Sequence, residues 1–352
     1  MQTNLESPIK HSPKPRRAIR AKTPERAHEL PETMRAAAIN AFDGPSALSI
    51  HSLPVPLPRA DEVLIATHTA GVETWDAETR GGWSPTGRRP HFPLVLGTEG
   101  SGMIVAVGSR VRRFAVGDTV YGASFPKMGF YAEYVAVPAE SVARLPKGLD
   151  LGHAGMMMAA LTALQGIDDA LKLRKGETLA IHGASGGVGM FAVQFAKLRG
   201  ANVFASASGA DGAGFVRRLG ADKVVDGKSD DIEKAARAFA PDGFDAALFY
   251  IGGPTQKTIL DLVRTGGRAA YPNGVEPAPK KSRGLRVKAY DGLIGTREID
   301  QLNRAVEAGA LKVPIAAAFG LADAAKAHER LAAGHVLGKI VLRIGGASRA
   351  RS

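Results

Sequence analysis

The stretch that decides the fold is Ala180–Lys197, which reads AIHGASGGVGMFAVQFAK. A short apolar run ends at His182, a loop of small residues follows, and a helical pattern begins near Gly189. Ala184, Gly186 and Gly189 stand at the spacing of a dinucleotide-binding fingerprint, with Ala in the first place. The first residue permits a tight turn, the second lets backbone approach a pyrophosphate, and the third lets the helix pack closely on the strand.

The helix after this loop would point its free N–H groups and the positive end of its dipole at the phosphates. The order of strand, loop, helix and next strand makes the pattern more specific than glycines alone. We therefore predict a dinucleotide-binding loop made of Ala184, Ser185, Gly186, Gly187, Val188 and Gly189.

Outward from this loop, between about Leu151 and Gly292, apolar runs alternate with amphipathic segments. This alternation predicts a parallel, doubly wound α/β sheet. The segment before it, Met34 to Pro146, has short β-type runs closed by Gly, Pro or Asp, which predicts a small β-barrel or sandwich. The last apolar run, Ile340–Ile344, falls outside the alternation and is expected to return to the first domain.

The first 33 residues contain several prolines among charges, seven basic residues against four acidic ones, and little that could pack. We expect a disordered basic arm there. The whole chain has a formal net charge of +12 and no cysteine, which excludes disulfides and cysteine zinc sites. No apolar run approaches the roughly 20 residues of a membrane span. We expect a cytoplasmic protein.

The choice of cofactor depends on the end of the next strand, about 20 residues after the loop. Sites for NAD usually carry Asp or Glu there to hold the ribose 2′-hydroxyl. This chain has Ser206 and Ser208, whose hydroxyls suit a 2′-phosphate, and Lys228 supplies a positive charge. These residues favour NADP over NAD.

Two later strands end at Gly252, in FYIGG, and at Asn273, in YPNG. Open α/β sheets bind ligands at the carboxyl ends of their strands, so both residues are predicted cofactor contacts. An ordinary turn is the alternative for Asn273.

The segment Gly71–Gly82, GVETWDAETRGG, follows an alternating run and carries three acidic residues and a tryptophan. Glu73 is a candidate proton donor if burial raises its pKa, and otherwise a carboxylate that faces solvent or bonds loop N–H groups. Tyr121, Tyr131 and Tyr134 are alternative proton sources. Asp76 is expected to cap the turn after it, and nearby Trp83 either stacks on a planar acceptor or packs in its loop.

Several motifs together resemble one family over about Met34 to Ile344: LVLGTEGSGMIVAVGSRVRRFAVGDTVYG, LTALQGI, HGASGGVGMFAVQFAK, LGADKVVD and LGKIVL. They resemble the medium-chain dehydrogenase/reductase superfamily, in its quinone oxidoreductase branch. The resemblance implies a Rossmann domain, residues 155–292, inserted into a GroES-like β-barrel catalytic domain, residues 34–154 with 293–352. It also implies a homodimer or homotetramer.

The same resemblance suggests two more cofactor contacts. Thr162, in LTALQGI, is similar to the family residue beside the nicotinamide, although a helix hydroxyl that bonds its own backbone is the alternative. Lys339, in LGKIVL, matches a family position near the cofactor, with a surface lysine as the alternative.

The zinc alcohol dehydrogenases of this superfamily read GVC and GHE where this chain reads GVE, with Glu73, and GTE, with Thr98 and Glu99. We therefore predict no metal site, and a reaction that needs no Lewis acid. Relatives in the quinone oxidoreductase branch often carry Asn at the Glu73 position, and Lys and Tyr where this chain has Gly212 and Gly227.

The leading hypothesis is an NADP(H)-dependent enzyme that transfers hydride to a small electrophilic acceptor, a quinone or an α,β-unsaturated carbonyl. A second hypothesis is an enoyl-thioester reductase with a basic mouth made of Lys280, Lys281, Arg283 and Arg286. A third, from another class, is a nucleic-acid-binding protein that uses the basic arm on an inactive reductase scaffold.

Overall fold

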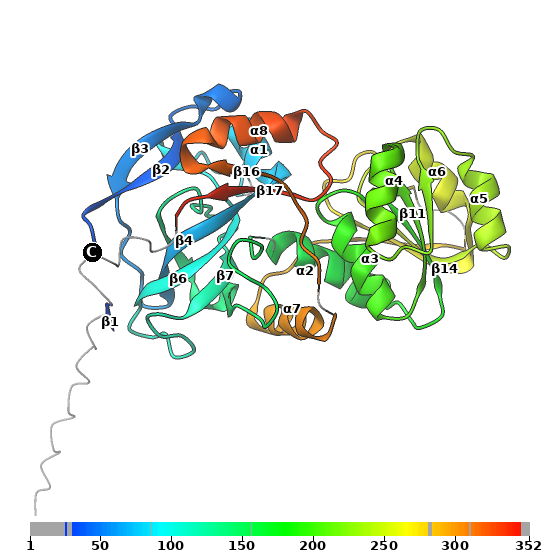
Figure 1. The fold of residues 1–352 in the computed structure, drawn as a ribbon, viewed down its shortest axis with the longest axis horizontal. Coiled ribbons are helices and arrows are strands. Elements are labelled where there is room, and N and C mark those ends of the chain that lie inside the picture. Colours follow the sequence, from blue (N-terminus) through cyan, green and yellow to red (C-terminus); the bar gives the residue numbers. More distant parts are fainter. Residues whose placement is uncertain are drawn as a thin grey trace, which may run out of the picture.

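The computed structural model describes residues 25–26, 30–84, 86–155, 157–280, 284–309 and 311–345. Two lobes lie side by side, one rich in β-structure and one in which strands alternate with helices (Figure 1). Each lobe is built around its own sheet. The predicted pairing of a β-domain with a parallel α/β domain is confirmed.

The α/β lobe contains a six-stranded sheet in the order β12-β11-β10-β13-β14-β15, and all neighbouring strands are parallel. Chain order reverses at β10, which lies between β11 and β13. At such a point a crevice opens at the carboxyl ends of the strands, where ligands of open α/β sheets bind. The strands are β10 Thr178–His182, β11 Asn202–Ala207, β12 Lys223–Asp226, β13 Phe244–Phe249, β14 Val263–Pro272 and β15 Arg286–Tyr290.

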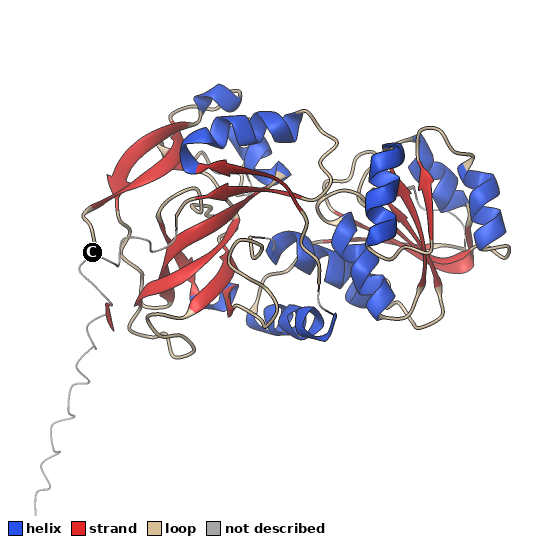
Figure 2. Cartoon of the chain, viewed as in Figure 1, coloured by secondary structure: helices blue, strands red, loops and turns tan. Residues whose placement is uncertain are grey.

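Helices cover both faces of this sheet (Figure 2). Successive side chains of a strand point to opposite faces. Leu179 and Ile181 of β10 therefore pack into the core that α3 and α4 cover, whereas Ala180 packs under α5 and α6. The four helices are α3 Gly189–Leu198, α4 Gly209–Arg218, α5 Ile232–Phe239 and α6 Pro254–Asp261.

The β-rich lobe has an eight-stranded sheet with the path β16-β17-β4-β6-β7-β9, to which β1 and β8 add at β6 and β4, and a three-stranded sheet β3-β2-β5. Two short helices, α1 Thr74–Arg80 and α8 Ala324–Ala332, belong to this lobe. Its strands are β1 Glu25–Arg26, β2 Thr33–Ile39, β3 Ser49–Pro54, β4 Glu62–Val72, β5 Leu94–Val95, β6 Glu99–Val107, β7 Thr119–Ala123, β8 Tyr134–Pro138, β9 Val142–Arg144, β16 Ile315–Gly320 and β17 Lys339–Arg343.

The last strand returns to the β-rich lobe, as its position after the α/β alternation predicted. β17 runs parallel to β16 and antiparallel to β4, with Ile340 opposite Val72. This register brings Lys339, the first residue of β17, beside Glu73, which follows β4. Two distant parts of the sequence thus meet at the boundary between the lobes.

Two helices, α2 Met157–Gln165 and α7 Thr296–Gly309, lie between the lobes (Figure 1). Ile299 and Leu302 of α7 are buried in the core that α2 and the α/β sheet share. On the other side, the Tyr121 hydroxyl of β7 donates a hydrogen bond to Asn303 Oδ1 at 2.6 Å. None of the described helices is long and apolar enough to cross a membrane.

The predicted disordered arm, residues 1–33, is corrected at its C-terminal end. Glu25–Arg26 form β1, which pairs antiparallel with Val107 and Ala106 of β6, and Thr33 already belongs to β2. On β6, only Glu99 to Met103 pair with β7. The rest of this edge of β6 has free backbone groups, with which a short strand such as β1 can pair. The remaining residues up to 29 lie outside the described part of the chain.

Candidate active site

A cleft of about 270 Å³ opens between the lobes. One wall is the glycine loop, from Gly183 to Gly189, together with Tyr250 and Ile251 after β13. The opposite wall carries Glu73 and Lys339 from the β-rich lobe. The cleft therefore lies at the carboxyl ends of β10 and β13, where the order of the sheet reverses.

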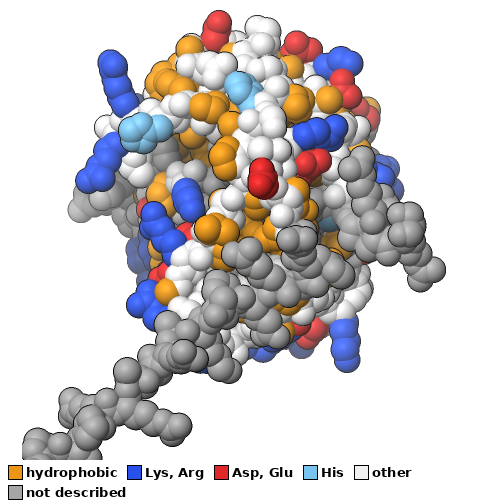
Figure 3. Space-filling model, turned by 90° about the vertical axis from the view of Figure 1, so that its left-hand side faces the viewer, with side chains coloured by type: hydrophobic (Ala, Val, Ile, Leu, Met, Phe, Trp, Pro, Cys, Tyr) orange, Lys and Arg blue, Asp and Glu red, His pale blue; other side chains and the backbone are white. Residues whose placement is uncertain are grey.

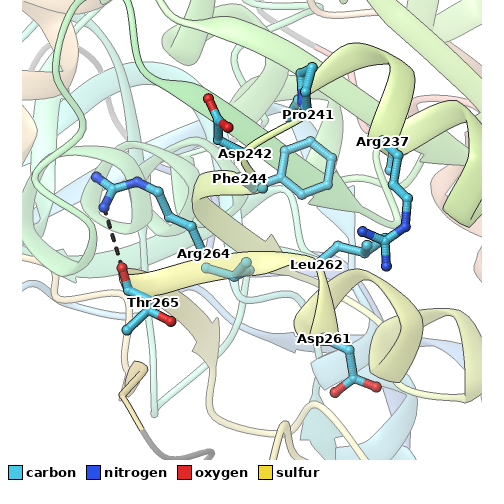
Figure 4. Close-up of a pocket in the computed structure, with 12 residues that line it drawn as sticks. Arg237, Pro241, Asp242, Phe244, Asp261, Leu262, Arg264 and Thr265 are labelled. Carbon is cyan, nitrogen blue, oxygen red and sulfur yellow. Dashed lines mark hydrogen bonds between the residues drawn. The ribbon is translucent and has the colours of Figure 1, made fainter.

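A second hollow, of about 320 Å³, lies at the amino ends of β13 and β14 (Figure 4). Two arginines line it from opposite sides, but each has an acidic partner: Arg237 pairs with Glu233 at 2.7 Å and Arg264 with Asp245 at 2.8 Å. Because this hollow is at the sheet edge away from the glycine loop, we place the candidate active site in the interdomain cleft.

The glycine loop leaves space for a ligand where side chains are missing. A Cβ on Gly189 would collide with the carbonyl of Gly183 and with the backbone of Ala184, so only glycine lets α3 begin this close to β10. A Cβ on Gly187 would meet nothing nearer than Lys339 Cδ at 3.8 Å, and Gly187 lines the cleft. The loop has the open backbone that a pyrophosphate requires.

Ser206 is turned into the core, so its predicted contact with a 2′-phosphate is corrected. Ser206 is 2% exposed and its Oγ lies 2.6 Å from Nδ1 of His182. The two residues are register partners on the parallel strands β11 and β10, so their side chains point to the same face. Burial lowers the pKa of His182 to about 4, so its imidazole is neutral.

Ser208 and Lys228 remain near the surface of the α/β lobe. Ser208 is half-buried and precedes α4, whereas Lys228 is exposed in the loop after β12. Asp226 joins the two segments, because its Oδ1 accepts the N–H groups of Gly209 (3.1 Å) and Lys228 (3.0 Å). Sequence reasoning missed Asp226, although its place at the end of the third strand was an available signal.

Thr162, Asn273 and Gly252 have local structural roles. The Thr162 hydroxyl donates to the carbonyl of Met158, one turn earlier in α2, at 2.8 Å. Asn273, which follows β14, donates from Nδ2 to Asp291 Oδ1 at 2.9 Å. A Cβ on Gly252 would collide with neighbouring backbone. The Thr162 bond matches its helix-hydroxyl alternative and Asn273 lies in a turn, as its alternative has it; the cofactor contacts of both residues stay predictions.

Three charged side chains form a buried cluster in the opposite wall: Glu73, Glu99 and Lys339. The Lys339 Nζ contacts Glu73 Oε1 and lies 3.1 Å from Glu99 Oε1. Lys339 is 2% exposed, so the surface alternative for this lysine is wrong. The other oxygen of Glu99 accepts the N–H of Met158 at 2.6 Å. Burial raises the pKa of Glu99 to about 8 and lowers the pKa of Lys339 to about 7.

A second buried group holds the backbone at Glu73. Asp76 Oδ2 accepts the N–H of Glu73 (2.9 Å) and the hydroxyl of Tyr131 (3.1 Å), so Asp76 caps the first turn of α1 as predicted. The same hydroxyl lies 3.1 Å from Nε2 of His328 in α8. Burial raises the pKa of Asp76 to about 8 and lowers the pKa of His328 to about 4, so Asp76 is mainly protonated and His328 is neutral at pH 7.

Aromatic rings gather around α1, which follows directly after Glu73 of the cleft wall. The ring centroid of Trp75, in α1, lies 5.1 Å from that of Trp83 and 6.2 Å from that of Phe125. Trp83 is 40% exposed and Phe125 is 36% exposed, so this aromatic cluster presents open ring surface. A Cβ on Gly274, after β14, would lie 3.6 Å from Trp75 Cη2, which shows that Trp75 reaches the α/β lobe. Sequence reasoning chose Trp83 and missed Trp75.

The positions compared with zinc ligands have other partners. Glu73 contacts the ammonium of Lys339, and Thr98, at the position of the histidine ligand, is a buried neutral side chain. In the part of the chain that the structure describes, no group of three or more His, Cys, Asp or Glu is arranged to hold a metal ion. Zinc independence itself stays a prediction.

Two family models match the chain. Residues 59–147 match the alcohol dehydrogenase GroES-like domain, and residues 219–342 match the zinc-binding dehydrogenase domain. The quinone oxidoreductase of Pseudomonas aeruginosa is 32% identical over 321 residues, which cover 86% of this chain and 97% of that protein. The human quinone oxidoreductase is 29% identical, covering 88% of this chain and 97% of its own.

Solved structures show the same architecture. The quinone oxidoreductase from Coxiella burnetii superimposes with a TM-score of 0.80 at 28% identity, covering 89% of this chain and all of that one. A mycobacterial protein solved in complex with NADPH has a TM-score of 0.78 at 26% identity, covering 88% of this chain and 100% of its own.

Proposed function

This chain belongs to the medium-chain dehydrogenase/reductase superfamily and is related to its quinone oxidoreductases, and we propose that it is an NADP(H)-dependent reductase of planar, electron-poor acceptors. The acceptors are quinones or α,β-unsaturated carbonyls. One observation carries the proposal: the open glycine loop faces Glu73 and Lys339 across one cleft, and the aromatic cluster begins at Trp75, two residues after Glu73. The relative in complex with NADPH supports the choice of cofactor.

The residues of the cleft fit a dinucleotide. Gly187 leaves its side of the loop open, and phosphates in the cleft would lie at the N-terminal end of α3, the positive end of its dipole. Ser208 and Lys228 are the remaining candidates for a 2′-phosphate. When bound, the reduced nicotinamide supplies the hydride.

The chain itself contributes orientation and exclusion of water. Trp75 and Trp83 offer ring faces on which a planar acceptor can stack. A quinone or enone accepts hydride readily because the negative charge delocalises onto its oxygen. The acceptor therefore needs to be positioned, and no Lewis acid is required in this proposal.

Reduction also requires a proton, and we assign its delivery to Glu73 and Lys339. Both line the cleft and contact each other. The pKa of Lys339, which burial lowers to about 7, is matched to proton transfer near neutral pH. Asp76 holds the backbone N–H of Glu73 and so fixes its position.

The two other hypotheses have less support. Arg286 begins β15 at the amino edge of the sheet, away from the cleft, so it is not at the mouth that a thioester carrier would need. Lys280 is exposed and does not line the cleft, and Lys281 and Arg283 lie outside the described residues. On the face shown in Figure 3, basic and acidic side chains are interspersed with apolar ones. A nucleic-acid-binding surface would instead present a continuous basic patch.

An acceptor panel tests the proposal. The loss of absorbance of reduced nicotinamide would be followed with bicyclic quinones, benzoquinones, 2-alkenals, an enoyl thioester and simple ketones. We expect oxidation of NADPH with quinones or enals and none with simple ketones. The absence of oxidation with every quinone and every enal would overturn the proposal.

A further inference from the structure

We infer that the cluster of Glu73, Glu99 and Lys339 takes up a proton when the pyrophosphate of a dinucleotide enters the cleft, so that cofactor affinity falls as pH rises. The inference rests on the proposed function only in taking a dinucleotide as the ligand. Glu73 and Glu99 are then positioning residues for the cofactor, acting through Lys339.

The first step is the charge of the cluster. Two carboxylates share one ammonium, so the fully ionised cluster has one negative charge in excess. Its members are removed from solvent, with Glu99 fully buried, Lys339 nearly so and the Glu73 side chain 15% exposed. Charges in such surroundings interact much more strongly than charges in water.

The second step is that few neighbours offset this excess. Burial raises the pKa values of Asp76 and Tyr131 and lowers that of His328, which keeps these groups mainly neutral near pH 7. Tyr250, which also lines the cleft, has its pKa raised well above the usual value by burial and is neutral too. Arg80 is the charged neighbour of this network, and it donates to the carbonyl of Asp43 at 3.0 Å.

The third step is the position of Lys339 relative to the phosphate site. A Cβ on Gly187 would lie 3.8 Å from Lys339 Cδ. The aliphatic part of the Lys339 side chain therefore lies next to the loop that is expected to hold the pyrophosphate. The two negative charges of a pyrophosphate would attract the ammonium and repel both carboxylates. A buried carboxylate that loses its cation favours its protonated form.

Bound pyrophosphate makes the cluster hold its protons more tightly. Negative charge beside the cluster raises the pKa of Lys339 from about 7 and of Glu99 from about 8. The complex then holds more protons than the free protein from about pH 7 upward. Uptake of one proton weakens binding by at most about tenfold for each unit of pH in that window.

Calorimetry of the whole chain counts these protons. The probe is ADP-ribose, which has the pyrophosphate but lacks the 2′-phosphate, a group that titrates by itself. Binding heats at pH 8 in HEPES and in Tris, two buffers with different ionisation enthalpies, give the number of protons exchanged. We expect uptake of about 0.5 to 1 proton per ADP-ribose bound.

Three variants separate the cluster from other proton sources. Glu73→Gln and Glu99→Gln should each reduce the uptake by more than half, because each removes one carboxylate while its amide can still accept a hydrogen bond. Glu78→Gln, on the exposed side of α1, is the matched control and should leave the proton uptake unchanged.

ADP-ribose binding without proton exchange overturns the inference, even if NADPH is oxidised normally. Uptake that persists unchanged in both Glu73→Gln and Glu99→Gln also overturns it. If NADPH binds and ADP-ribose does not, the pyrophosphate does not bind beside the cluster and the inference fails alone. If neither binds, the proposed function fails together with the inference.

Discussion

Glu73 shows how far a single residue can be interpreted without its partners. Its position after an alternating strand made it a candidate proton donor. The contact with Lys339 depends on the pairing of β17 with β4, two strands that lie far apart in the sequence. No local pattern in the sequence displays that contact, so the sequence alone could not assign Glu73 to a buried ion cluster.

Ser206 is a case in which the alternation of a strand does not decide the orientation of a side chain. Along Asn202–Ala207, side chains alternate between the two faces of the sheet, and Ser206 shares a face with Phe204. Phe204 is fully buried, but so are Val203 and Ala205 on the other face, so alternation alone did not predict that Ser206 bonds His182 in the interior. Trp75 was harder to predict, because its contact at Gly274 depends on how the two lobes face each other.

Asp76 leads to a prediction about pH and stability. Its pKa in the folded protein, about 8 because of burial, is above the ordinary value of 3.8. The folded state therefore binds more protons than the unfolded state between about pH 4 and pH 8, and its stability falls as pH rises through that window. The slope from one such group is at most about 1.4 kcal/mol per pH unit.

The variant Asp76→Asn should weaken this pH dependence, since the amide oxygen can still accept the bonds from Glu73 and Tyr131. Urea unfolding at pH 5 and pH 8 measures the change, with Asp261→Asn at the exposed end of α6 as control. The prediction is wrong if the free energy of unfolding changes between pH 5 and pH 8 by the same amount in the wild type and in Asp76→Asn. That result would show that Asp76 ionises normally.

At the scale of elements, the glycine loop gives two opposite expectations. A methyl group at Gly187 points into the cleft without a clash, whereas one at Gly189 strikes backbone. Gly187→Ala should keep the thermal stability of the free protein and weaken NADPH binding about tenfold, or about 1.4 kcal/mol. Gly189→Ala should destabilise the fold by about 1 to 3 kcal/mol.

Thermal unfolding and calorimetric titration with NADPH distinguish the two variants. The interpretation of the loop is wrong if Gly187→Ala binds NADPH as tightly as the wild type does.

The aromatic cluster on α1 and its neighbouring loops should select planar acceptors. Trp75→Leu and Trp83→Leu are each expected to raise KM for a bicyclic quinone about three- to tenfold, which corresponds to about 0.5 to 1.5 kcal/mol of stacking. KM for a short 2-alkenal should hardly change. Phe92→Leu, in the separate pair that Phe92 makes with Phe42 at 5.3 Å, is the matched control.

Steady-state kinetics with both acceptors provides the measurement. Equal increases in KM for the quinone and the alkenal would contradict a stacking role and would indicate a general disturbance of the cleft.

At the scale of the whole molecule, the sequence predicted the architecture well because its signals are local. The glycine loop, the α/β alternation and the displaced last strand each follow from spacing and periodicity. The place of α7 was less predictable, since the apolar stripe with Ile299 and Leu302 does not say which core it enters. The expected homo-oligomer and cytoplasmic location stay predictions.

The central claim is that the cleft transfers hydride from NADPH to a planar acceptor without a Lewis acid. The most direct test is the rate of NADPH oxidation by a bicyclic quinone, before and after exhaustive treatment with a chelator. We expect the same rate in both samples and no gain on addition of zinc. Loss of activity on chelation, followed by recovery with zinc, would contradict it.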